Sequence, residues 1–242
     1  MKLSFKERVI RRILPRGIYT LYKMFYFNVK AKNYSKIGGH VDLVAPLTLD
    51  TNAVELEPFS RLQNGVNIIS AHPQRLVVKK YAAVGAECII YPGTHVPTVG
   101  IPQYLSTMHI NDVNNEVVIP EDSWIGTRCI IMSKAKLGRG CIVGAGSFVN
   151  KTYPPYAVLA GSPAKVIAVR FTIDQILEHE RQLYPAEERF SREYLEQLFE
   201  ENFKDLRTIG TDKMSAEDRE RLSKRKAELG MYDGYTNKDI QE

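Results

Sequence analysis

Histidines are the side chains of this 242-residue chain best suited to accepting a proton near neutral pH, because imidazole titrates in that range. The sequence holds five of them, His40, His72, His95, His109 and His179. His109 lies in the segment His-Ile-Asn-Asp that ends at Asp112, so a carboxylate is near enough in sequence to orient its ring. The chain contains no Cys-x-x-Cys, no nucleophile elbow and no phosphate-binding glycine loop followed by a helix. The histidines are therefore the candidate acid–base groups.

A period of six residues organises the middle of the chain that must position these groups. From Ile119 an aliphatic residue recurs every six positions, at Ile119, Ile125, Ile131, Leu137, Val143 and Val149. A small residue follows four places after each of the first five, at Ser123, Cys129, Ala135, Cys141 and Ser147. This period fits neither a helix nor an alternating strand, and it predicts a prism-like parallel β-solenoid. The aliphatic residues should point into the core, and the small residues should fill the space near the corners.

The same register extends upstream and is interrupted once. Val78, Val84, Ile90 and Val96 are spaced by six, with Ala82, Cys88 and Thr94 at the small positions. The spacing from Val96 to Ile119 is 23 positions, which is not a multiple of six, and this predicts an excursion over residues 95–117. Val41 and Leu47 are candidates for the start of the repeat, and residues 53–74 are ambiguous. Glycine after the aliphatic residue, at Gly126, Gly138 and Gly144, suggests a turn that needs relaxed backbone limits.

The three cysteines could bind a metal, act as nucleophiles or form a disulfide. All three, Cys88, Cys129 and Cys141, fall on the small inward position of the repeat. A free cysteine is a good buried filler, so we expect structural thiols and a reducing compartment.

The two ends of the chain differ from the solenoid. Residues 1–35 form a basic segment with helical spacing, broken at Pro15–Gly17, which should either cap the solenoid or contact an anionic membrane surface peripherally through residues 1–32. Residues 172–242 are charge-dense and predict one or two helices packed on the solenoid. We find no apolar run that could span a bilayer and no signal peptide. Nucleic-acid binding is not supported, because the basic excess is confined mainly to the N-terminal segment.

Three segments resemble the hexapeptide-repeat acyltransferases. They are Val118–Gly126 (VIPEDSWIG), Val143–Ser147 (VGAGS) and Tyr153–Ile167 (YPPYAVLAGSPAKVI), the last resembling the C-terminal signature of that family. The resemblance covers about residues 36–171. It implies a mainly β protein built on a left-handed parallel β-helix, a homotrimer, and acetyl-CoA as donor. The chain looks most similar to bacterial polysaccharide O-acetyltransferases, which implies acetylation of a sugar hydroxyl. Together with the cysteines and the basic N-terminal segment, we expect a cytoplasmic protein that could contact the inner face of the membrane peripherally.

The resemblance also selects a base. In this family the catalytic histidine directly follows the small residue of a coil and opens the excursion, and His95 after Thr94 fits that description. We expect His95 to remove the proton of the sugar hydroxyl, with His109 as the competing base or as a contact to the acceptor. The partner that orients the imidazole stays open between Glu87, Asp112 and Glu116.

Acetyl-CoA needs a groove, backbone amides and cations. Trp124 should face outward and form either a wall of the groove or part of a trimer interface. By resemblance, the small residues that let the pantetheine arm approach are Gly126, Thr127, Gly144, Ala145 and Ala160. Lys165 is the first candidate for the phosphates and Lys151 the second. No metal is expected.

Three alternatives remain. The same fold could acetylate a small hydroxylated antibiotic, a free sugar or an amino sugar. A carbonic-anhydrase-like enzyme could bind zinc through His72, His95 and His109, although the acyltransferase-like C-terminal signature has no role there. The solenoid could also be a non-catalytic scaffold.

Overall fold

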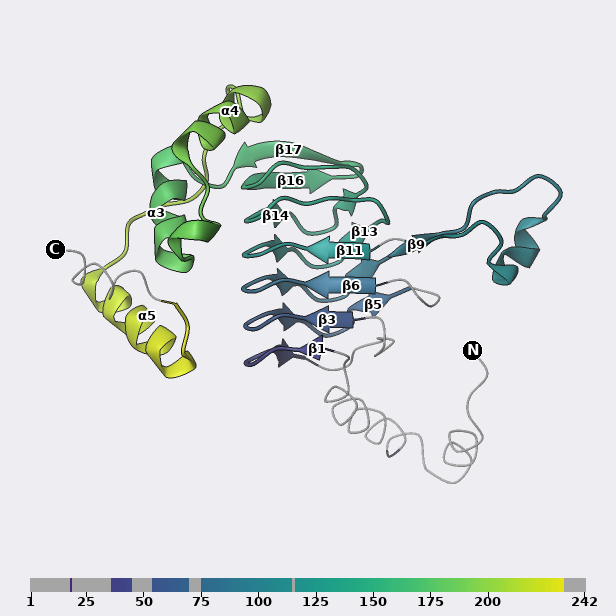
Figure 1. Ribbon diagram of the computed structural model, residues 1–242, viewed down its shortest axis with the longest axis horizontal. Helices are drawn as coiled ribbons and strands as arrows, with labels where there is room; N and C mark the ends of the chain where they lie inside the picture. The colour runs from purple at the N-terminus through teal and green to yellow at the C-terminus, as the bar shows by residue number, and fades with distance from the viewer. Residues whose placement is uncertain (1–17, 19–35, 45–53, 70–74, 115, 233–242) are drawn as a thin grey trace.

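The computed structural model describes residue 18 and residues 36–44, 54–69, 75–114 and 116–232 (Figure 1). The expectations for the N-terminal segment, its contact with a membrane and His72 lie outside the described residues. Among the residues that are described, no helix is both long and apolar enough to cross a membrane.

Short parallel strands stack into a prism with three faces, which we name A, B and C (Figure 1). Face A contains β1 (Lys36–Ile37), β3 (Val54–Leu56), β6 (Arg75–Val78) and β11 (Glu116–Ile119). Face B contains β2 (Asp42–Leu43), β4 (Arg61–Leu62), β7 (Ala83–Val84), β12 (Trp124–Ile125), β14 (Ile142–Val143), β16 (Ala157–Gly161) and the antiparallel β17 (Ala164–Val169). Face C contains β5 (Asn67–Ile68), β8 (Ile89–Ile90), β13 (Ile130–Ile131) and β15 (Phe148–Val149). The fold is a left-handed parallel β-helix, so the predicted fold class is confirmed.

The predicted inward residues build the core. From Ile119 to Val149 five of the six aliphatic residues are at most 1% exposed, and Leu137 is partly buried against the core. The small residues at the corners are buried too, including all three cysteines, which are free, but Thr94 at the start of the excursion is exposed. Burial raises the pKa of the Cys141 thiol to about 12, so it stays protonated and unreactive. Val96 is an exception, because it is 38% exposed and belongs to the excursion.

The first coils follow a different register from the one that the sequence suggested. Leu43 pairs with Leu62, so the inward column continues at Leu43 and not at Val41. The backbone of Ile37 pairs in register with Leu56. Leu47 lies outside the described residues. The ambiguous segment 53–74 contributes a full coil through β3, β4 and β5. Its buried residues Leu56, Leu62 and Ile68 are themselves six apart, a signal that the polar residues between them concealed.

Glycine follows the aliphatic residue for a reason other than the predicted one. Gly126, Gly138 and Gly144 do not have positive φ angles; the left-handed residues of the same coils are others, among them Asp122, Arg128, Gly140 and Gly146. A Cβ on Gly126 would lie 2.6 Å from the amide nitrogen of Ala145, and one on Gly138 would lie 2.3 Å from the nitrogen of Pro155. Glycine at these positions lets the backbone of the next coil approach closely.

Replacing Gly138 by alanine is expected to destabilise the fold by about 1–3 kcal/mol, the usual cost of forcing an extra carbon into a packed site. The matched control is Gly39→Ala, because a Cβ on Gly39 would meet nothing within 4 Å. Urea denaturation of both variants checks this. Equal urea midpoints for Gly138→Ala and Gly39→Ala would show that the close approach of the next coil is not the reason for glycine at position 138.

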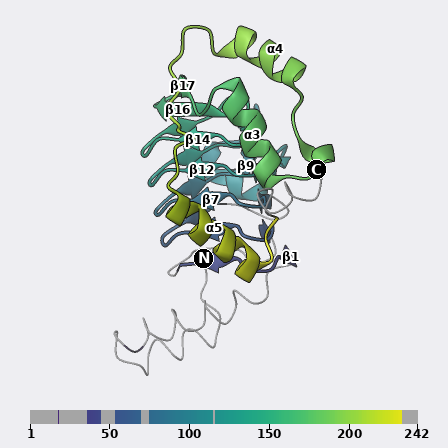
Figure 2. The same cartoon turned by 90° about the vertical axis from the view of Figure 1, so that its left-hand side faces the viewer.

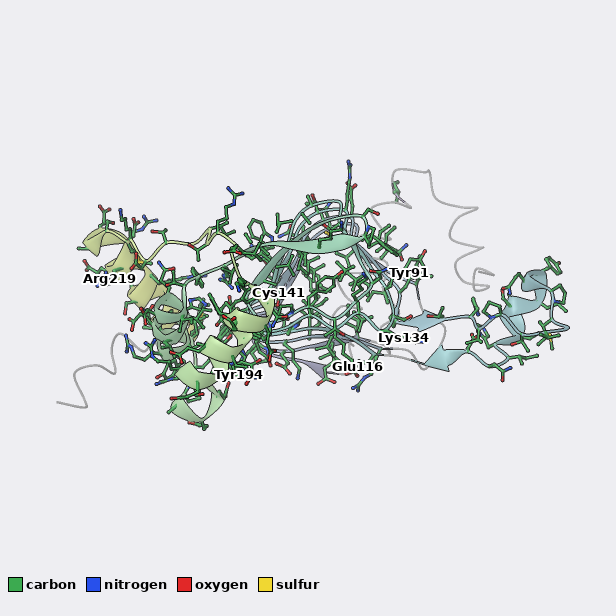
Figure 3. All side chains as sticks on the ribbon, turned by 90° about the horizontal axis from the view of Figure 1, so that it is seen from above. Tyr91, Glu116, Lys134, Cys141, Tyr194 and Arg219 are labelled. Carbon is green, nitrogen blue, oxygen red and sulfur yellow. The ribbon has the colours of Figure 1, made fainter. Side chains whose placement is uncertain are left out.

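The excursion is an arm that projects from the edge of the prism between face C and the next strand of face A (Figure 1). Its stem is an antiparallel pair, β9 (Gly93–Thr94) with β10 (Val113–Asn114), and its outer part carries a 3₁₀ helix, η2 (Gln103–Met108). Figure 3 shows the arm on the opposite side of the prism from the C-terminal helices, with Lys134 and Tyr91 close to its base.

The described part of the C-terminal extension, residues 172–232, contains three α-helices, one more than the upper expectation (Figure 2). They are α3 (Ile173–Leu183), α4 (Arg192–Asn202) and α5 (Ala216–Leu229), with a 3₁₀ turn, η3 (Ala186–Glu188), between the first two. Hydroxyl side chains of Thr172, Ser191 and Ser215 cap their N-termini. The third helix was missed because it buries only Lys226, so it lacks the apolar stripe from which a helix is predicted.

Buried ion pairs attach this extension to the corner between faces A and B. Glu180 on α3 is fully buried, accepts a hydrogen bond from the Tyr156 hydroxyl at 2.6 Å and pairs with Arg139 at 3.0 Å. Asp122 accepts from Arg170 at 2.6 Å and from His179 at 2.8 Å. Burial would raise the pKa of Asp122, but the hydrogen bond from His179 and the charge of Arg170 outweigh it, and the pKa is lowered. Asp122 therefore stays ionised, close in sequence to Trp124.

Candidate functional site

The arm brings His95, His109 and Asp112 together. The Nδ1 atom of His95 lies 3.0 Å from each carboxylate oxygen of Asp112. The Nδ1 atom of His109 lies 2.7 Å from Oδ2 of the same carboxylate. The two imidazole rings are 5.5 Å apart between centroids. Both predicted candidate bases thus share one carboxylate. We call these three side chains the His95–His109–Asp112 cluster.

Backbone structure fixes each member of this cluster. His95 directly follows β9, and pairing of Thr94 with Val113 holds the two sides of the stem in register. His109 ends η2 in a left-handed conformation with φ 54°, and its amide donates to the carbonyl of Ser106 at 2.9 Å. A left-handed backbone is uncommon outside glycine and tends to persist where the surroundings require it. Here it turns the His109 ring toward Asp112.

The carboxylate of the cluster is ionised and accepts hydrogen bonds from both histidines. The hydrogen bonds from His109 and from His95 lower the pKa of Asp112, so this side chain, only 9% exposed, is ionised at neutral pH. The two histidine side chains are 49% and 47% exposed. A neutral imidazole that donates its Nδ1 proton to a carboxylate presents an unprotonated Nε2. The cluster can therefore supply a general base whose tautomer is set by Asp112.

The structure also distinguishes between the three candidate orienting groups. Glu87 pairs with Arg128 at 2.7 Å on a different corner of the prism. Glu116 accepts from Nε of Arg75 at 2.7 Å on face A. Asp112 contacts both histidines, so it is the orienting group. The sequence spacing had indicated this contact for His109 and had left it open for His95.

The predicted cofactor-binding residues gather at the corner between faces B and C. Trp124 faces outward on β12 and is 60% exposed, as its place in the repeat predicted. Gly126 and Thr127 follow it, Gly144 and Ala145 occupy the same turn of the next coil, and Ala160 lies beyond Gly144. Lys165 is exposed on β17 and pairs in register with Ala160. The six-residue repeat thus stacks residues from separate parts of the sequence into one surface.

Two of the predicted backbone contacts are already used inside the coil. The amide of Gly126 donates to the carbonyl of Val143 at 2.8 Å, and that of Gly144 donates to Leu159 at 2.7 Å. These amides hold neighbouring coils together and cannot at the same time bind a pantetheine arm. Thr127 and Ala145 are exposed turn residues and remain candidates for contacting the pantetheine arm.

Within one chain the two groups of residues lie at opposite edges of face C. The arm leaves after β8, at the end of face C, whereas the turn with Gly126 and Thr127 leads into face C at β13. The outward residues of this face include Ile89, Ile130 and Phe148, which are only partly buried. A substrate that reaches both groups must cross this face, or a second copy must supply one of them.

The remaining described histidines have other surroundings. His40 stacks on Phe59 with the ring centroids 5.3 Å apart, and His179 belongs to the network of Asp122. His72 lies outside the described residues, so the zinc alternative built on His72, His95 and His109 stays a prediction.

Comparison with known proteins agrees with this architecture. Residues 116–151 match the family described as bacterial transferase hexapeptide (six repeats). A chloramphenicol acetyltransferase from Klebsiella aerogenes is 37% identical over 75 residues, which cover 31% of this chain and 36% of that protein. The chain thus spans about a third of the length of this relative.

Solved structures show the same fold. A hexapeptide-repeat-containing acetyltransferase from Vibrio cholerae O1 biovar eltor, complexed with acetyl coenzyme A, aligns with a TM-score of 0.51 at 16% identity, covering 67% of this chain and 82% of that one. A maltose O-acetyltransferase from Clostridium difficile 630 aligns with a TM-score of 0.51 at 20% identity, covering 69% and 83%. The resemblance noted in the sequence is confirmed: residues 116–151 match the hexapeptide family, and the chain shares the β-helix fold of these acetyltransferases.

Proposed function

We propose that this protein is an acetyl-CoA-dependent O-acetyltransferase that acts on a sugar hydroxyl of a surface or capsular polysaccharide. The observation that carries the proposal is the His95–His109–Asp112 cluster, because it presents an exposed imidazole whose Nδ1 is held by an ionised carboxylate. Acetyl-CoA as donor is supported by the related acetyltransferases and by the solved complex of a protein with the same fold.

The chemistry follows from the geometry of His95. Its Nε2 removes the proton of an acceptor hydroxyl as the oxygen attacks the thioester carbonyl of acetyl-CoA. Asp112 stabilises the imidazolium that forms, since the carboxylate already accepts the Nδ1 proton. When the tetrahedral intermediate collapses, the carbon–sulfur bond breaks and the leaving thiolate takes the proton from Nε2. The acetyl group moves directly, with no acyl-enzyme.

We further propose that the working unit is a homotrimer. The base and the groove residues lie at opposite edges of face C in one chain, and a neighbouring copy can bring them together. The surfaces that such a contact would cover are apolar and exposed: Val99, Tyr104 and Met108 on the arm are 103%, 90% and 60% exposed, and Trp124 is 60% exposed. Sedimentation equilibrium of the purified protein tests this, and a monomer would contradict it.

The acceptor class is tested by a panel of hydroxyl compounds. Polysaccharide fragments, free sugars and chloramphenicol are each incubated with acetyl-CoA and enzyme, and the acetylated product is detected by mass spectrometry. Chloramphenicol belongs in the panel because relatives that share 37–43% identity over short segments are named for it. Acetylation of a glycan fragment in preference to the antibiotic supports the polysaccharide acceptor, and the reverse preference replaces it by a xenobiotic one.

Replacing Asp112 by asparagine is expected to lower the turnover number by roughly 10–10²-fold. A hydrogen bond to a charged group contributes about 1.5–3 kcal/mol, and each 1.4 kcal/mol is about tenfold in rate. Because the pKa of Asp112 is lowered, its carboxylate stays ionised throughout the neutral range, and the wild type should lose no activity there through protonation of Asp112. Glu116→Gln is the matched control, since Glu116 pairs with Arg75 instead of a histidine. Equal turnover numbers for wild type and Asp112→Asn would remove Asp112 from the mechanism.

A further inference from the structure

The His95–His109–Asp112 cluster has a second property besides its fitness as a base. Its three ligand atoms, one from each side chain, all lie within 4.8 Å of one another. Two imidazole nitrogens and one carboxylate oxygen are a donor set that zinc accepts, with a fourth position left for water. Magnesium and calcium prefer oxygen ligands, so two imidazoles favour a borderline transition-metal ion.

The separations are close to those that zinc requires. Zinc bound at about 2.0–2.1 Å in tetrahedral geometry places its ligand atoms about 3.3 Å apart. In the cluster the nitrogen–oxygen separations are 3.0 Å for His95 and 2.7 Å for His109. An ion can therefore enter if each nitrogen moves a few tenths of an ångström away from the carboxylate oxygen, with all three ligand atoms already within 4.8 Å of one another. About half of each histidine side chain is exposed, so the cluster is open to solution.

We propose that the His95–His109–Asp112 cluster binds a zinc-type divalent ion, and that the bound ion switches off the base by reversing its tautomer. A neutral imidazole carries one proton. When Asp112 accepts that proton from Nδ1, Nε2 is free to act as the base. When a metal occupies Nδ1, the proton must reside on Nε2, which then donates and cannot accept. This inhibitory consequence rests on the proposed function, whereas the binding of the ion does not.

The binding arm of the test needs no substrate. Untagged full-length protein, first stripped with a chelator, is titrated with zinc chloride by calorimetry, and with cobalt chloride while the visible absorption of tetrahedral cobalt is followed. One ion per chain is expected. His109→Gln, His95→Gln and Asp112→Asn should each weaken binding by at least about tenfold. His40→Gln is the matched control, since His40 is exposed on a different part of the prism. Circular dichroism confirms that each variant is folded.

Two results of the binding arm would overturn the site. One is the absence of binding by the folded wild-type protein. The other is binding that survives in all three cluster variants, which would place the ion elsewhere, for example at His72.

The activity arm measures acetylated acceptor by mass spectrometry with and without zinc, because zinc binds free thiols and would distort a thiol assay. Zinc is expected to abolish acetyl transfer by the wild type, a chelator to restore it, and magnesium to have no effect. His109→Gln, compared with its own zinc-free rate, should need at least about tenfold more zinc for the same fractional loss. Binding without loss of transfer would overturn the tautomer switch. Binding by a protein that transfers no acetyl group to any acceptor would leave the metal site standing and refute the proposed function instead.

Discussion

Replacement of His95 by alanine is expected to lower the turnover number for acetyl transfer by about 10²–10⁴-fold, the range in which general-base catalysis contributes. The Michaelis constant for acetyl-CoA should change little, because the predicted donor-binding residues lie on other coils. Steady-state kinetics with a saturating acceptor measures both quantities. The paired measurement on His109→Ala decides between the two histidines of the cluster.

His109→Ala is expected to lower the turnover number by about fivefold, which corresponds to the loss of one ordinary hydrogen bond of about 1 kcal/mol. The two variants should differ in their loss of turnover because the backbone holds the two histidines differently, although both contact Asp112 at 2.7–3.0 Å. His95 follows the paired stem strand directly, whereas His109 lies at the end of a 3₁₀ turn further along the arm. The stem should hold the imidazole more firmly in the geometry that the reaction needs. A larger loss in His109→Ala than in His95→Ala would transfer the role of base to His109.

Replacement of Arg139 by leucine is expected to destabilise the fold by about 3–5 kcal/mol, because it leaves the fully buried carboxylate of Glu180 without its cation. Arg139 also stacks over the rings of Tyr184 and Phe190 at 4.5 Å and 4.9 Å, so the variant loses packing as well as charge. Thermal unfolding followed by the fluorescence of Trp124, the single tryptophan, would report the loss close to the network.

Arg128→Leu is the matched control for this prediction. Arg128 pairs with Glu87, but their side chains are 75% and 52% exposed, and such surface pairs contribute about 0–1 kcal/mol. The double variant Arg139→Leu with Glu180→Leu should recover part of the lost stability, because no unpaired charge is then buried. If Arg139→Leu and Arg128→Leu unfold at the same temperature, the buried pair does not anchor the C-terminal extension.

The sequence predicted the prism well because its period is read directly from inward residues. Ile119, Ile125 and Ile131 mark successive strands, and burial of their side chains leaves little choice of register. The register of the first coils was harder to predict, because each strand has a single inward residue. In β2 that residue is Leu43, and the nearby aliphatic residue Val41 fits the sequence pattern as well. The role of Gly126 was read as conformational, whereas only the backbone of the next coil shows that it is steric.

The candidate site was predictable in its residue types and less so in its geometry. The position of His95 at the start of the excursion follows from the repeat, but its contact with Asp112 depends on the fold of the arm, which has no period. The turn around Gly126, Thr127 and Ala145 was located correctly by the repeat. That the amide of Gly126 is already bonded to the next coil could not be known before the coils were stacked.

Acetyl-CoA binding by the purified wild-type protein tests the central claim most directly, because every step proposed for His95 requires the donor. Isothermal titration calorimetry with acetyl-CoA, with Lys165→Ala measured in parallel, gives the result before any acceptor is known. We predict saturable binding with one site per chain, and weaker binding in Lys165→Ala. No detectable binding to the folded protein would contradict the acetyltransferase and leave the β-helix as a scaffold or a metal-binding protein.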